Sequence, residues 1–389
     1  MCWRAIMLGA IFSPSVATLD PRRVPCPMTI GRCLGGEDHV YDNTEEWAGN
    51  LEPTLDYIRQ LLQTCVEIEH STIPLYLTAC YSMRNTSTWE HGIIQGIAIE
   101  EMLHMTNVAN VLNAIGGAPS IDSPSFIPTF PIDIPVINIT AGVRPFGRDA
   151  TNTFEQIETT YETTKTITAT YSYIARMLVD LTIKYGEKAV FSGDPALQVS
   201  VSTHGGESSR VITGLASAVS ALHGVSDQGS GCPAADPFGF NISAGPLGGG
   251  VAHWARFKEV LVGREFLPND TAATGPTGPT HSIDWGGASY TFESNPRVED
   301  FPEGSDAHAL ALAFASNYTM LLVKLHAVFN GSPQTFSQTL SVMYKLRQMA
   351  VQMMNTHDPR LPSNMSVGIG MLHVAAVLLC VQYASRCAC

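Results

Sequence analysis

The sequence has little charge and no run of basic residues. Charged residues make up 15% of its 389 residues, and 35 Asp and Glu against 22 Lys and Arg give a formal net charge of −13. A protein that binds a nucleic acid needs a basic surface for the phosphate backbone, so this balance excludes nucleic acid as a partner. The hydrophobic content of 45% is typical of a globular protein with a sizeable core.

Cysteine spacings typical of zinc sites are also missing. None of the nine cysteines forms a Cys-x-x-Cys pair, so a metal site built from thiolates is not expected. Cys26 and Cys33 are close enough for a small disulfide loop, which would fit an oxidising compartment. Cys65 and Cys80 lie in apolar helical surroundings, where we expect plain buried thiols.

The N-terminal residues have the composition of a secretory signal peptide. Arg4 is followed by an apolar stretch over 5–12 and a small-residue site at 15–17, so we expect a signal over 1–17 with cleavage after Ala17. A buried N-terminal segment is the alternative. Seven N-glycosylation sequons, where chance gives about two or three, also favour a secreted or extracellular protein. The sequons begin at Asn85, Asn138, Asn241, Asn269, Asn317, Asn330 and Asn364.

The C-terminal tail, residues 356–389, contains the most apolar run of the chain, residues 367–384. At 18 residues, with His373 and Gln382 inside, this run is borderline for a membrane span. It is compatible with a GPI or membrane anchor signal, which would attach the protein to a membrane surface. It is equally compatible with a final packed helix, and both interpretations stay open.

Helical periodicity dominates the rest of the chain. Helices are predicted over 52–83, 89–115, 154–185, 209–227, 250–262, 306–329 and 334–355. Long connections rich in proline and glycine separate several of them, and an irregular leader over 18–50 precedes them. The predicted class is therefore mainly α, with one helical domain over 51–355 that includes a C-terminal helical extension.

Two of these helices place acidic and imidazole groups among apolar residues. In the first, Glu69 follows Leu62 and Cys65 on the stripe that should face the core. In the second, Glu101 and His104 lie on a seam of apolar residues spaced by three and four. Burying an unpaired carboxylate costs several kcal/mol, so these groups need a compensating partner.

A divalent metal ion would supply that partner. Glu-x-x-His places Glu101 and His104 on one helical face toward a shared ion, and Glu69 on the preceding helix strengthens this interpretation. Without a metal, Glu101 and His104 would form a buried hydrogen-bonded pair. Glu100 is a fallback ligand, whereas Glu67 and His70 form a second Glu-x-x-His on a flank of their helix.

Several motifs, in their order along the chain, resemble the motifs of one protein family. Residues 67–79 (EIEHSTIPLYLTA), 99–105 (IEEMLHM) and 113–117 (NAIGG) resemble the ferritin-like domain of iminophenylpyruvate dimer synthases, enzymes of violacein- and rebeccamycin-type pathways. The resemblance continues through 186–195, 227–231, 252–257, 276–279 and 329–331, and so covers roughly 51–355. It implies a four-helix metal core built from the helices around residues 69, 104, 227 and 253.

The resemblance extends the set of metal ligands. Glu69, Glu101 and His104 match the first two metal helices of the family, and His253 matches its histidine before an aromatic-x-Arg-Phe run. The third metal helix departs from the family pattern, because Ser230 stands where the family tends to have a glutamate. Asp227, three residues earlier, is the predicted substitute ligand, with a role in a helix-terminal turn as the alternative. One ion, or an asymmetric pair, is therefore expected.

The predicted function is that of a secreted ferritin-like metalloprotein. By analogy it is a non-haem iron oxidoreductase that acts on a small imine or amino-acid-derived substrate. One or two iron ions are the expected cofactor, with another divalent metal as the alternative, and no catalytic acid or base can be assigned. The competing prediction is a non-catalytic secreted metal-binding or cell-surface protein that retains the bundle. The sequence does not predict an oligomeric state.

Overall fold

The computed structural model describes residues 54–134, 139–159, 167–202, 207–230, 237–238, 250–285, 289–357 and 366–368. The predicted signal peptide, the leader over 18–50 and nearly all of the apolar C-terminal run lie outside the described residues. The sequons at Asn138, Asn241 and Asn364 lie outside them as well.

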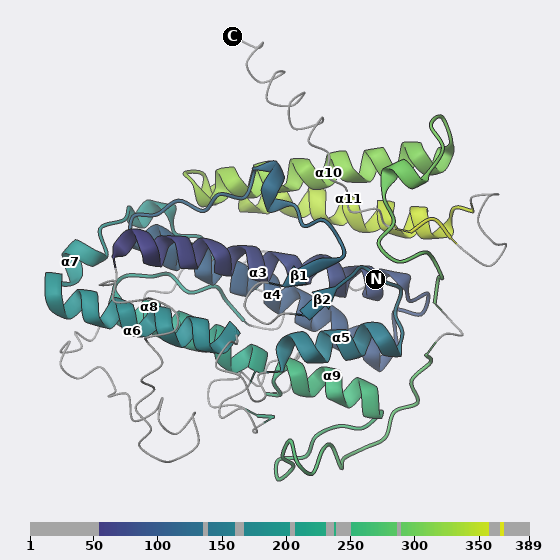
Figure 1. Cartoon of the computed structure of the whole chain (residues 1–389), viewed down its shortest axis with the longest axis horizontal. Coiled ribbons are helices and arrows are strands. Elements are labelled where there is room, and N and C mark those ends of the chain that lie inside the picture. Colours follow the sequence, from purple (N-terminus) through teal and green to yellow (C-terminus); the bar gives the residue numbers. More distant parts are fainter. Residues whose placement is uncertain are drawn as a thin grey trace.

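Helices make up most of the described chain, which confirms the mainly α class (Figure 1). The α-helices are α3 (Leu55–Ser82), α4 (Trp89–Ala114), α5 (Arg148–Glu158), α6 (Ile167–Tyr185), α7 (Glu187–Val190), α8 (Leu215–Ser230), α9 (His253–Val262), α10 (Asp306–Phe329) and α11 (Phe336–Asn355). Short 3-10 turns lie at Pro124–Phe126, Pro195–Leu197, Val298–Asp300 and Pro333–Thr335. Strands β1 (Ile132–Ile134) and β2 (Ile139–Ala141) form a small antiparallel sheet, in which Ile132 pairs with Ala141.

Local sequence signals explain where the two longest bundle helices begin and end. The hydroxyl of Thr54 accepts a hydrogen bond from the Tyr57 amide at 3.2 Å, and Thr88 caps α4 in the same way. α4 ends before Gly116, whose φ of 72° is the left-handed conformation that favours glycine at this position. The predicted helix end at Gly116 is therefore confirmed.

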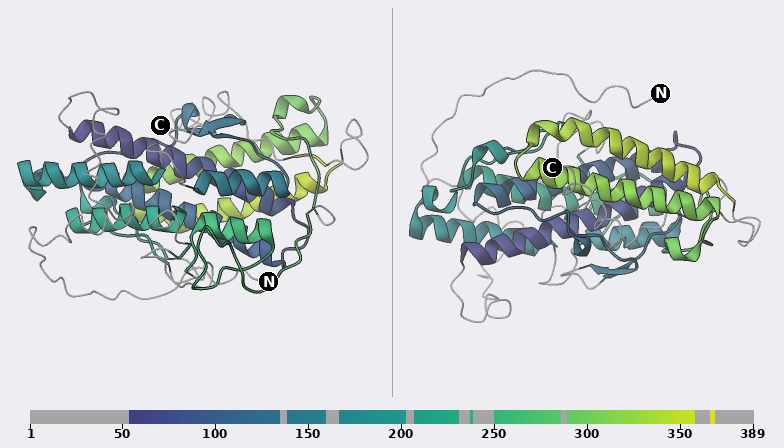
Figure 2. Two further views of the ribbon diagram at one scale, coloured as in Figure 1. Left: turned by 60° about the horizontal axis from the view of Figure 1, so that its bottom comes forward. Right: turned by 90° about the horizontal axis from the view of Figure 1, so that it is seen from above.

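The helices form a four-helix bundle in which two of the four positions are divided. α3 and α4 pack along each other, while α6 packs against α8 and α5 against α9. α6 also contacts α3, and both α8 and α9 contact α4. In Figures 1 and 2, α5 lies beyond the end of α6, and α9 lies beyond the end of α8. The third and fourth positions of the bundle are thus each formed by two shorter helices.

The prediction of one continuous helix over 154–185 is wrong at Thr159. α5 ends at Glu158, and Thr159 has an extended backbone with ψ of 131°. The amide and the hydroxyl of Thr159 both donate to the carbonyl oxygen of Glu155, at 2.9 and 2.6 Å, and so cap the last turn of α5. Periodicity alone predicted that the helix would continue past this residue.

α10 and α11 form a helical hairpin on the side of α3 and α4 opposite to α6 and α8 (Figure 1). Phe314, Tyr318 and Leu322 of α10 are buried in the main core. Among the described residues, α10 with its 24 residues is long and apolar enough to cross a membrane, a property that core helices of soluble proteins share. Leu312 and Met320 on its outer side are exposed.

Candidate metal centre

Four buried side chains from three helices meet inside the bundle. Glu69 comes from the middle of α3, Glu101 and His104 come from the middle of α4, and His253 is the first residue of α9. None of the four exposes more than 3% of its surface. The structure therefore brings together four of the five residues predicted as metal ligands.

The ligand atoms of these residues converge on a small volume. His253 Nδ1 lies 2.7 Å from Glu101 Oε1, and His104 Nδ1 lies 3.6 Å from the same oxygen. Glu69 Oε2 lies 3.5 Å from His104 Nδ1. One donor atom each from Glu101, His104 and His253 falls within 4.8 Å of the others, as a shared ion requires. The two imidazole rings stack with their centroids 5.2 Å apart.

Two of these buried ligand atoms lack a well-aligned hydrogen bond. Glu101 Oε1 and His253 Nδ1 are fully buried and only 2.7 Å apart, yet neither has a hydrogen bond of acceptable geometry. Buried polar atoms normally have a partner, and leaving one unsatisfied costs about 1–3 kcal/mol. A cation between the donors would satisfy both atoms, so the residues present fit a bound metal.

The far nitrogen of each histidine has its own partner. His253 Nε2 lies 2.7 Å from Glu100 Oε2, and Glu100 also forms an ion pair with Arg256. His104 Nε2 lies 2.8 Å from Gln228 Oε1. Because each of these oxygens accepts a hydrogen bond from Nε2–H, both histidines present Nδ1 to the cluster. Glu100, the fallback ligand, therefore orients His253 in this structure.

Glu158 is a member of the site that the sequence reasoning missed. It is the last residue of α5, and its Oε2 lies 3.7 Å from His253 Nδ1. Its other oxygen accepts a hydrogen bond of 2.6 Å from the hydroxyl of Tyr76. Glu158 follows the buried Phe154 by four residues, so helical periodicity already placed this carboxylate on the core face. That signal was available in the sequence.

Asp227 lies on α8 but outside this convergence of ligand atoms. Among the described residues, the group whose donors could share one ion consists of Glu101, His104 and His253, whereas Asp227 acts electrostatically on His223 of its own helix. The neighbouring Gln228 contacts His104 instead. Ser230, at the departure from the family pattern, donates to the carbonyl oxygen of Ser226 at 2.9 Å. A ligand role for Asp227 stays a prediction.

The other residues singled out by the sequence lie around the site. Cys65 and Cys80 are buried free thiols, as predicted. Glu67 is exposed, whereas His70 on the same helix is buried and lies 2.6 Å from the hydroxyl of Tyr318. In the second Glu-x-x-His motif, Glu67 therefore faces solvent, whereas His70 lies at the interface between α3 and α10.

Tyrosine and phenylalanine side chains separate the cluster from solvent. Tyr171 of α6 is fully buried and donates its hydroxyl to Glu69 Oε1. The ring of Tyr76 packs against Phe154 and Phe257, with centroids 4.8 and 5.1 Å away. These contacts keep water from the carboxylates and hold them in one orientation, which strengthens every electrostatic interaction inside the site.

The burial of so many ionisable groups shifts their pKa values. Burial, and then the charge of Glu101, raise the pKa of Glu69 to about 8. Burial would lower the pKa of His253, but Glu100 and Glu101 raise it to about 10. Burial likewise opposes protonation of His104, yet the carboxylates of Glu101 and Glu69 raise its pKa well above the usual value. The metal-free cluster therefore keeps protons that a bound cation would displace.

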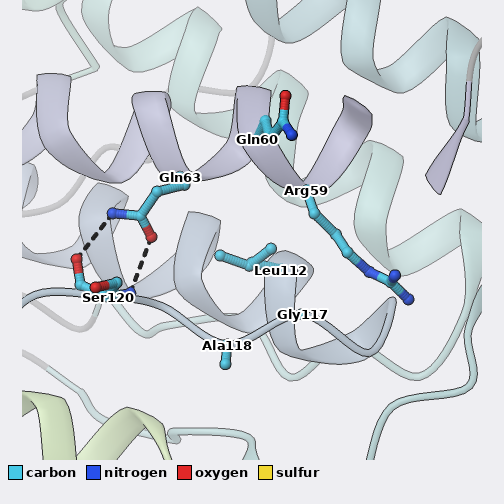
Figure 3. A pocket seen from close by; sticks show the side chains of 7 residues that line it. All are labelled: Arg59, Gln60, Gln63, Leu112, Gly117, Ala118 and Ser120. Carbon is cyan, nitrogen blue, oxygen red and sulfur yellow. Dashed lines mark hydrogen bonds between the residues drawn. The ribbon is translucent and has the colours of Figure 1, made fainter. Parts of the chain in front are cut away.

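A separate surface hollow of about 300 Å³ lies between α3 and the segment that follows α4 (Figure 3). The side chain of Gln63 holds this segment through two hydrogen bonds of 2.9 Å to the backbone of Ser120. Arg59 donates to the carbonyl oxygen of Ile115, at the C-terminus of α4. None of the proposed ligands lines the hollow, and the side chains of Gln63 and Arg59 are held by backbone groups.

Comparisons with known proteins agree with this architecture. A protein-family model described as ferritin-like matches residues 62–262, just over half of the chain. The crystal structure of a ferritin-like protein from Caulobacter vibrioides is similar, with a TM-score of 0.51 and 21% sequence identity over 77% of this chain and 95% of that chain. No curated protein matches the sequence. The matched residues include the whole Glu and His cluster, and the chain belongs to the ferritin-like family.

Proposed function

We propose that the protein is a non-haem iron oxidoreductase whose metal is held by Glu101, His104 and His253. The observation that supports the proposal is the convergence of these three donors within 4.8 Å in a buried site. Imidazole and carboxylate together suit iron and related divalent metals. The fold adds support, because ferritin-like bundles build such sites from facing helices.

The donor set is sufficient for one ion or for an asymmetric pair. His253 and Glu158 would bind an ion on one side of the cluster, and His104 and Glu69 would bind an ion on the other side. Glu101 lies between these two pairs of residues. This division gives each histidine one carboxylate of its own. Glu158 takes the role of the third-helix carboxylate that the sequence lacks at Ser230.

Bound iron would supply the one-electron chemistry with dioxygen that amino acid side chains cannot perform. The chain's own residues bind, orient and manage protons. Before a metal binds, Glu69 holds a proton with a pKa of about 8, and the hydroxyl of Tyr171 donates a hydrogen bond to Oε1 of Glu69. Phe154 and Phe257 exclude water on the side of Glu158. We assign no separate catalytic acid or base.

The substrate class we propose is a small imine or an amino-acid-derived compound. It rests on the sequence motifs shared with iminophenylpyruvate dimer synthases, and therefore on analogy. A purified full-length chain should contain iron and consume oxygen with aromatic amino acids or their imines. Glu101→Gln should lose most of the iron, whereas Glu67→Gln, an exposed glutamate on α3, should retain it. Iron binding equal in Glu101→Gln and the unmodified protein would refute this site.

A non-catalytic secreted metal-binding protein is the second candidate. The specific observation that favours it is Ser230, which replaces the glutamate of the related enzymes and bonds to its own helix. Iron bound at one or two ions per chain without oxygen consumption would support this alternative. A chain that binds no metal at all would contradict both candidates.

We also propose that the protein is secreted and glycosylated. The signal-like residues 1–17 and the number of sequons support this localisation. Asn85 and Asn269 are exposed, whereas Asn330 donates its amide to the carbonyl oxygens of Pro119 and His326. Expression in eukaryotic cells, followed by glycopeptide mass spectrometry, should find glycans at the two exposed sites and none at Asn330. Absence of any glycan would contradict secretion.

A further inference from the structure

The two histidines of the candidate metal centre have chemically different outer partners. His253 Nε2 lies 2.7 Å from a carboxylate oxygen of Glu100, which Arg256 keeps ionised. His104 Nε2 lies 2.8 Å from the amide oxygen of Gln228. A carboxylate partner makes a metal-binding imidazole a stronger donor, whereas a neutral amide does so less. The two histidines are therefore unequal ligands.

Glu207 determines which way the Gln228 amide points. Gln228 Nε2 donates to Glu207 Oε1 at 3.2 Å, from a segment that precedes α8. An ionised carboxylate only accepts hydrogen bonds, so the amide nitrogen must face Glu207. Rotating the amide by half a turn would place its oxygen against that carboxylate. The amide oxygen of Gln228 is thereby directed toward His104.

The contact with Gln228 requires one particular ring nitrogen of His104 to carry a proton. Because an amide oxygen is only an acceptor, the proton must lie on Nε2 of His104. Nδ1 faces the oxygens of Glu69 and Glu101, 3.5 and 3.6 Å away, and becomes free to bind a metal ion when it gives up its proton. A neutral imidazole with this tautomer is the form that binds a metal ion through Nδ1.

We propose that Gln228, held in place by Glu207, is a positioning residue that fixes the tautomer of His104 for metal binding and leaves His104 the weaker donor of the two histidines. This inference rests on the proposed metal site. It gives a function to the α8 sequence Gln228-Gly229-Ser230, in which Ser230 stands where the family tends to have a glutamate. The side of the site nearest His104 should therefore bind metal less tightly than the side nearest His253.

The experiment is a Co²⁺ titration of the full-length protein, followed by its visible absorption spectrum. Gln228→Leu removes the acceptor and should weaken binding about 10–100-fold, with changed absorption bands. The double variant Gln228→Glu with Glu207→Gln keeps the net charge but moves the carboxylate next to His104, and should bind more tightly than the unmodified protein. Gln156→Leu, at an exposed glutamine of α5, should bind as the unmodified protein does.

Each outcome decides the inference. Unchanged affinity and spectrum in Gln228→Leu would overturn the positioning role, and binding in the double variant no tighter than in the unmodified protein would overturn the ranking of the donors. If Co²⁺ binds to no form, the proposed metal function fails instead. In that case ¹H–¹⁵N spectra of metal-free protein still test the contact, because the Nε2 proton of His104 should shift in Gln228→Leu. No shift would refute it.

Discussion

Glu158 shows how a single side chain outside the Glu-x-x-His motifs can complete the site. It lies at the last residue of α5, where the hydroxyl of Tyr76 orients one oxygen and the other lies 3.7 Å from His253 Nδ1. Its carboxylate comes from α5, whereas Glu69 and Glu101 come from α3 and α4. Sequence motifs did not identify it, because it belongs to no Glu-x-x-His pair.

Substituting Glu158 should weaken the binding of a metal ion. We expect Glu158→Gln to lower the affinity for Co²⁺ or Fe²⁺ at least about 10-fold, since a charged donor near His253 becomes neutral while its shape is kept. Glu155→Gln is the matched control, because Glu155 lies one turn earlier on α5 and pairs with Lys258 at 3.7 Å. Metal titrations of both variants provide the comparison. Equal affinities would remove Glu158 from the site.

At the scale of elements, the C-terminus of α4 is held by the turn after α7. The amide of Gly193 donates to the carbonyl oxygen of Ala114 at 3.0 Å. A Cβ at Gly193 would lie 1.8 Å from the carbonyl oxygen of Asn113, which is backbone and cannot move aside easily. The turn therefore needs glycine because of this close approach rather than because of an unusual φ.

Gly193→Ala should consequently separate the turn from α4. We expect a loss of about 1–3 kcal/mol in the free energy of unfolding, as in other overpacked interiors. Gly92→Ala is the control on α4, because a Cβ there meets nothing within 4 Å. That change should leave stability equal or raise it by about 0.5–1 kcal/mol, since alanine favours helix. Urea unfolding curves measure both, and equal curves would contradict the proposed contact.

The junction of α3, α4 and α11 contains a buried histidine. His91 Nε2 lies 3.2 Å from Cys80 Sγ, and burial together with the charge of Arg347 lowers the pKa of His91 from 6.5 to about 4. The folded state thus keeps His91 neutral while the unfolded state gains a proton below pH 6.5. The stability contribution is present above about pH 6.5 and is lost as pH falls toward about 4.

This junction should make the protein sensitive to acid. Between about pH 6.5 and about pH 4, the unmodified protein should lose more unfolding free energy than His91→Gln, by about 1–3 kcal/mol. Denaturant unfolding at both ends of that interval measures the difference. The same pH dependence in the two proteins would show that His91 is not responsible.

Helices and site residues could be predicted from the sequence where the signal is local, but not where it depends on packing between helices. α4 was predicted almost to the residue, because Thr88 caps its start and Gly116 follows its end. The helix over 154–185 was wrongly joined, since periodicity does not register the extended backbone at Thr159. Glu69, Glu101 and His104 were identifiable from polar residues on apolar stripes. Gln228 was not, because its contact with His104 arises only when α8 packs against α4.

For the whole molecule, the divided third and fourth bundle positions coincide with the candidate metal centre. Glu158 ends α5 and His253 begins α9, so both interruptions place a donor at the same level as Glu69 and Glu101. The two continuous helices, α3 and α4, provide the rigid part of the site.

Metal and pH should therefore act on the stability of the entire bundle. In the metal-free protein, the pKa of Glu69 is raised from 4.5 to about 8 and that of His253 from 6.5 to about 10. The folded state then binds more protons than the unfolded state across this range. Metal-free stability should fall as pH rises through it, because deprotonation leaves buried carboxylates together without compensation.

The stabilisation that a bound metal adds should, in contrast, increase as pH rises. A cation replaces the protons of the cluster, so its affinity should increase from about pH 6 to about pH 8. With free metal at about 100 times the dissociation constant, the expected stabilisation is about 2.7 kcal/mol. Thermal unfolding with Zn²⁺ and with EDTA across this pH range measures the gap in Tm, which should widen toward alkaline pH. A gap that narrows, or none at any pH, would mean that these buried carboxylates and imidazoles do not exchange protons for a metal ion.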